Sequence, residues 1–92
     1  MKALGMIEVY SFTTALYVAD VAAKAADVKI IAFDRNRPFA PGFPVPLIMV
    51  VKMEGDVAAV EAAVEAGSKR AEEISGLIQS HIIARPTEDS EK

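Results

Sequence analysis

The chain alternates between short apolar runs and longer stretches in which apolar residues recur at helical spacing. Four runs are rich in β-branched or other large apolar residues and are bounded by polar residues, glycine or proline, a pattern that predicts strands. They cover residues 3–10, 28–33, 46–53 and 77–84. The third run, PLIMVVKM, is almost continuously apolar, which is typical of a central strand.

A first helix is predicted after the first strand. Ser11, Thr13 and Thr14 offer hydroxyl N-caps, and the helix is expected to run for about three turns through Ala26. Its sequence is dominated by alanine, which favours helix and allows a neighbour to approach closely. We expect small residues over most of its surface.

A second helix is predicted after Gly55-Asp56, where the chain is expected to break and Asp56 can serve as the cap. Ser75-Gly76 is expected to end it. Its outer face is charged, as a solvated helix face usually is. The apolar and small residues with spacings of 3 and 4 are Val57, Val60, Val64, Gly67, Ala71 and Ile74.

The order of these elements predicts the fold class. Strand, helix and strand are followed by a long connection and then by strand, helix and strand. This is an α+β fold of the ferredoxin-like, split βαβ type, with a four-stranded antiparallel sheet and two main helices on one face. We assign residues 1–86 to a single domain and residues 87–92 to a polar, disordered tail. Enzymes, regulators and structural modules share the fold, so it does not give the function.

Composition narrows the class of protein. The chain has 92 residues, of which 52% are hydrophobic, and a small domain this apolar often gains stability by oligomerising. It has no cysteine, which suits a reducing cytosol. The net charge of −3 argues against nucleic-acid binding. No apolar run approaches the roughly 18–20 residues of a membrane span, so we expect a soluble cytoplasmic protein.

The residues that carry chemistry form no recognisable catalytic set. His81 is the only histidine and lies within the last strand, where a packing or hydrogen-bonding role is the more common one. It has no cysteine or second histidine with which to hold zinc. Asp34, Glu54 and Asp56 lie near the ends of elements, where carboxylates cap and solvate. We therefore predict a protein that is not an enzyme, with no catalytic, cofactor or metal site.

Several motifs together resemble one family. They are A-L-G-M-I-E at residues 3–8, A-D-x-x-x-K-A-A in the first helix, G-D-V-x-A-V at 55–60 and H-I-I-x-R-P at 81–86. In this order and at these spacings they resemble the hexameric shell proteins of bacterial microcompartments, over residues 3–33 and 47–86. The resemblance implies homohexameric discs that tile edge to edge, with other shell paralogues, around encapsulated enzymes. It also implies control over the passage of small metabolites.

The resemblance implies roles for two cations. Lys24 falls where the family carries a lysine along the seam between neighbouring discs. Arg85, in the Arg85-Pro86 pair, falls where the family has an arginine that reaches across the seam. Taken from the residues alone, both are ordinary solvated cations.

The connection between the second and third strands departs from the family pattern. The family has a short turn rich in glycine and serine here, and six copies of it line a pore on the symmetry axis. This chain instead has a segment of residues 35–46 with four prolines, which should be stiff and extended. The predicted pore residues are Arg35, Asn36, Arg37, Pro38, Phe39, Ala40, Pro41, Gly42, Phe43 and Pro44.

Two interpretations of this connection stay open. On a sixfold axis, Phe39 and Phe43 could gather into an apolar plug or collar, with the arginines as an anion-attracting ring. Alternatively the phenylalanines pack on their own subunit and the connection is only a rim. The connection also hints at a compartment of the glycyl-radical, choline- or diol-degrading type. The alternative function is a small-molecule-binding regulator on the same scaffold, with the connection as a lid.

Overall fold

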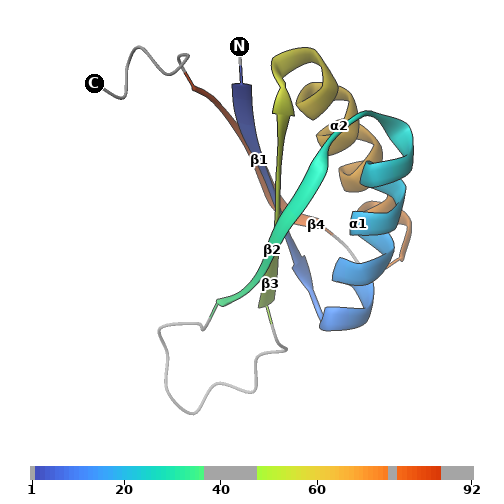
Figure 1. Ribbon diagram of the computed structural model, residues 1–92. Helices are drawn as coiled ribbons and strands as arrows, with labels where there is room; N and C mark the ends of the chain where they lie inside the picture. Colours follow the sequence, from blue (N-terminus) through green and yellow to red (C-terminus); the bar gives the residue numbers. More distant parts are fainter. Residues whose placement is uncertain (1, 37–47, 75–76, 86–92) are drawn as a thin grey trace.

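The computed structural model describes residues 2–36, 48–74 and 77–85. The strands and helices follow one another in the order β1 (Lys2–Tyr10), α1 (Phe12–Ala25), β2 (Lys29–Asn36), β3 (Ile48–Asp56), α2 (Val57–Ile74) and β4 (Leu77–Arg85). The strands form one sheet in the order β2-β3-β1-β4, in which each neighbouring pair is antiparallel. Both helices cover the same face of the sheet (Figure 1). The predicted ferredoxin-like fold class is confirmed.

The sheet is built from two interleaved β-α-β units. β3 lies between β1 and β2, and β1 lies between β3 and β4. α1 packs over the β2–β3 half of the sheet, whereas α2 packs over β1 and β4. The connection from β2 to β3 leaves one end of the sheet, and α1 and β4 both finish at the opposite end (Figure 1).

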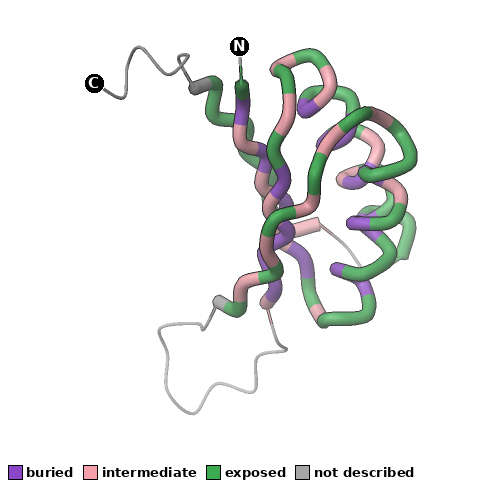
Figure 2. The backbone as a smooth tube through the Cα atoms, viewed as in Figure 1, coloured by how far each residue is buried: buried purple, intermediate pink, exposed green. Residues whose placement is uncertain are grey.

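The core lies between the sheet and the two helices, where the buried segments of Figure 2 face one another. Alternate residues of β1 point into it, as do alternate residues of β3. The fully buried side chains of largest volume are Ile7, Met53, Val9, Val18, Val51 and Val60. The helical period predicted for residues 57–74 is confirmed in its middle, because Val60, Val64, Gly67 and Ala71 are buried.

Gly5 allows α2 to approach β1 closely. A Cβ at this position would lie 2.8 Å from a methyl of Val60 and 2.8 Å from a methyl of Val64. Gly67 does the same from the helix side, since a Cβ there would lie 2.8 Å from Ile7 Cδ1 and 3.1 Å from Val18 Cγ1. The two glycines therefore set the distance between the layers.

The cap of α1 is confirmed at Ser11. The backbone N–H of Thr14 donates to Ser11 Oγ at 3.2 Å. Ser11 itself has φ 73°, in a region that residues other than glycine rarely adopt. The hydrogen bond to the helix N-terminus offsets part of the resulting strain.

Two predicted boundaries are wrong. Gly55 and Asp56 do not break the chain but are the last residues of β3, where they pair with Ala3 and Lys2. β1 is long enough to pair with β3 over its whole length, and α2 follows at once. Arg35 and Asn36 belong to β2 rather than to the connection, and they pair with residues 49 and 48. Proline lacks the backbone N–H that a strand donates to its neighbour, and the first proline of the chain is Pro38. The residues before it can therefore all pair with β3.

The surface of α1 also differs from the prediction. Small residues do dominate its last turns, but its first half carries Phe12, Leu16 and Tyr17, each about half exposed. The alanines at positions 15, 19 and 22 are buried instead. The small residues thus serve packing within the subunit, and the large ones face outward.

Candidate assembly surfaces

Lys24 lies in the last turn of α1 with its side chain 76% exposed. Its Nζ donates to Asp20 Oδ2 at 3.0 Å, one helical turn earlier. Exposed pairs of this kind contribute little to stability, so the ammonium can exchange Asp20 for another acceptor at small cost. The position leaves this cation available to a neighbouring molecule.

Arg85 is the last residue of β4, where its backbone pairs with Lys2 at the start of β1. It therefore lies at the same end of the sheet as the end of α1, although α1 covers the half of the sheet remote from β4 (Figure 1). The structure thus places Lys24 and Arg85 at one end of the subunit but on different halves of it.

The predicted pore residues divide into two groups. Residues 37–44 lie outside the described residues, so their predicted role stays a prediction. Arg35 lies in β2 and is exposed, next to the point where the connection begins. The backbone of Asn36 ends that strand.

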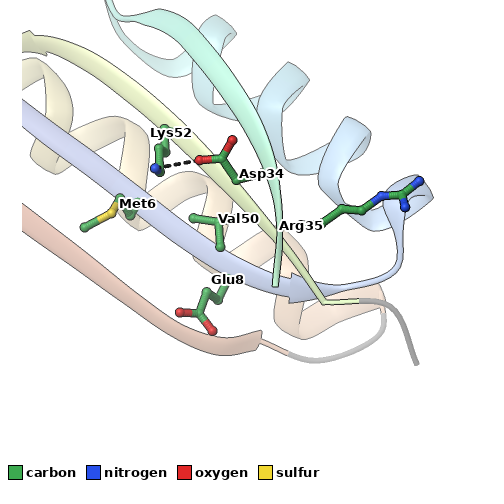
Figure 3. Close-up of a pocket in the computed structure, with 6 residues that line it drawn as sticks. All are labelled: Met6, Glu8, Asp34, Arg35, Val50 and Lys52. Carbon is green, nitrogen blue, oxygen red and sulfur yellow. Dashed lines mark ion pairs between the residues drawn. The ribbon is translucent and has the colours of Figure 1, made fainter. Parts of the chain in front are cut away.

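The face of the sheet that lacks helices carries charged and apolar side chains side by side. Lys52 Nζ lies 2.6 Å from Asp34 Oδ2 across β2 and β3, and Gln79 Nε2 donates to Glu8 Oε2 at 2.9 Å. A shallow pocket on this face is lined by Met6, Glu8, Asp34, Arg35, Val50 and Lys52. In Figure 3 Asp34 and Lys52 point toward each other, whereas Arg35 points away from them.

The chemistry of this pocket is that of a solvated surface. Its ion pair is partly exposed, and among the described residues no group of three or more histidine, cysteine or carboxylate side chains could hold a metal ion.

His81 is exposed on β4 opposite Met6. Within the described residues, no helix is long and apolar enough to cross a membrane.

An apolar surface on α1 is a feature that sequence reasoning missed. The ring of Phe12 contacts that of Phe33 in β2 edge-to-face, with 6.1 Å between the centroids. Leu16 follows Phe12 by one turn, while Tyr17 lies on the side of α2, under the guanidinium of Arg70 at 6.0 Å. The sequence does carry a signal for this surface. Phe12 and Leu16 are one helical turn apart, and they lie beside the buried stripe of Ala15, Val18 and Ala22 rather than within it.

Comparison with known proteins identifies the family. The model of the BMC domain matches residues 3–86. The microcompartment shell protein PduK of Salmonella typhimurium is 37% identical over 87 residues, which is 95% of this chain and 50% of that protein. The microcompartment shell protein PduA of Citrobacter freundii is 34% identical over 91 residues, with 99% of this chain and 89% of that protein covered. The carboxysome shell protein CsoS1A of Hydrogenovibrio crunogenus is 39% identical over 90 residues, covering 97% of this chain and 85% of that protein.

A solved structure agrees with these relatives. A microcompartment protein from Desulfitobacterium hafniense superposes with a TM-score of 0.69 at 29% identity, over 90% of this chain and 41% of that one. The chain spans about half the length of PduK but most of the length of PduA and CsoS1A.

The fold and these matches define a shell-protein domain. The chain belongs to the BMC-domain family of bacterial microcompartment shell proteins, as its motifs indicate. Because its relatives are structural shell proteins, membership supports a structural role and points away from catalysis.

Proposed function

We propose that this chain is the subunit of a homohexameric tile that assembles laterally into the facets of a microcompartment shell. The arrangement of the subunit's two ends supports this proposal most directly. β2 ends and β3 begins at one end of the sheet, whereas α1 and β4 finish at the opposite end (Figure 1). Lys24 lies in the last turn of α1, and Arg85 is the last residue of β4. A subunit with this polarity can direct one end to a symmetry axis and the other to the rim of a closed ring.

At the rim, Lys24 and Arg85 join neighbouring hexamers. The support for Lys24 is its exposure and its weak intrahelical pair with Asp20. Across a seam it could donate to a carbonyl or carboxylate of the next hexamer, an interaction that strengthens as water is excluded. Arg85 supplies a planar, multidentate donor at the same end.

At the axis, the segment that contains Phe39 and Phe43 narrows or closes the opening. The prolines at positions 38, 41, 44 and 46 limit its backbone freedom, and twelve phenylalanines from six copies would form an apolar ring. Arg35, which is exposed beside the connection, and Arg37 would add cations around it. Deleting residues 39–46 and determining the structure of the hexamer tests this, since an unchanged axial opening would exclude the plug.

The hexamer governs the passage of small metabolites in a cytoplasmic compartment and shares its facets with other shell paralogues and enclosed enzymes. The relatives include both microcompartment and carboxysome shell proteins. Our proposal of a compartment for glycyl-radical, choline or diol chemistry rests on the unusual connection.

Native mass spectrometry of the purified protein at moderate salt tests the proposal. We expect a dominant species of six subunits, and sheets or tubes by electron microscopy at low salt. A monomer or trimer that binds a small effector saturably would contradict the tile and favour the regulator.

A further inference from the structure

We draw no further inference here: the strongest candidate, the exposed apolar surface patch of Phe12, Leu16 and Phe33 where α1 meets β2, carries nothing because no contact among the described residues shows what covers it.

Discussion

The two central strands of the sheet and its two edge strands are built from similar apolar residues but place them in different surroundings. Ile7 of β1 and Val51 of β3 are fully buried between the layers. Ile31 and Phe33 of β2 and Ile82 and Ile83 of β4 are between 37% and 49% exposed. The centre is covered by the subunit's own helices, whereas these side chains of the edge strands stay partly open to solvent. The fold of the subunit is therefore stabilised chiefly by side chains of the two central strands and the helices that cover them.

The largest expected effect comes from a matched pair of truncations, one in each region. Ile7→Ala should lower the free energy of unfolding by about 2–5 kcal/mol, because it leaves a cavity in the core. Leu16→Ala should change the free energy of unfolding of the subunit by no more than about 1 kcal/mol, because Leu16 is about half exposed. Urea denaturation at several protein concentrations measures both. Equal effects on the isolated subunit would contradict the division between centre and edge.

A second test sharpens the role of close packing at the centre. Gly5→Ala should cost about 1–3 kcal/mol, since the new methyl would meet the stiff side chains of Val60 and Val64. Gly67→Ala should cost less, because the nearest atom is the terminal methyl of Ile7 and alanine favours helix by about 1 kcal/mol. Thermal unfolding of the two variants compares them. A milder effect at Gly5 than at Gly67 would argue against the fixed spacing of β1 and α2.

The N-terminal cap of α1 belongs to neither pair of strands, and its removal should have a moderate effect on the free energy of unfolding. Ser11→Ala removes the cap and should cost about 1 kcal/mol. Ser11→Gly also removes it but relieves the strain of φ 73°, so this variant should be the more stable of the two. Chemical denaturation followed by circular dichroism ranks them, and the reverse order would show that strain at Ser11 is negligible.

The smallest effect on the free energy of unfolding is expected for Lys24, the cation that we propose for the rim of the hexamer. Lys24→Ala removes an exposed pair worth about 0.3–0.5 kcal/mol, so the melting temperature should hardly change. The proposed seam should nevertheless fail, and electron microscopy at low salt should show hexamers without sheets. Lys69→Ala, another exposed lysine on the outer face of a helix, is the control and should still form sheets.

Much of the fold follows from the sequence because burial within one subunit leaves a periodic pattern. The alternation along residues 3–9 and the 3-and-4 spacing of Val60, Val64 and Gly67 both report the core. The boundary predicted at Asp56 is wrong, because a glycine before an acidic residue is typical of a turn although pairing with β1 keeps it extended. Lys24 and Arg85 carry no local signal of their role; only the resemblance to a family separates them from other solvated cations.

The outward residues of α1 show why its exposed surface was harder to predict than the core. Phe12 and Leu16 lie in a helix full of alanine, and amphipathic periodicity assigns large apolar side chains to the inside. Here the interior beneath α1 is narrow and takes Ala15, Ala19 and Ala22 instead. Which apolar side chains of the helix face outward depends on the distance between the helix and the sheet, which the sequence pattern alone does not give.

The pairing of Lys2 with Arg85 brings the beginning of β1 and the end of β4 side by side. A short linker could join them, and the chain could then be opened between β2 and β3 without cutting a strand. Such a circular permutant would keep the sheet order and both helices while moving both termini to the opposite end of the subunit. A fused enzyme or peptide would then be carried at the end where the β2–β3 connection now lies, which makes the fold a scaffold whose attachment point can be chosen by topology alone.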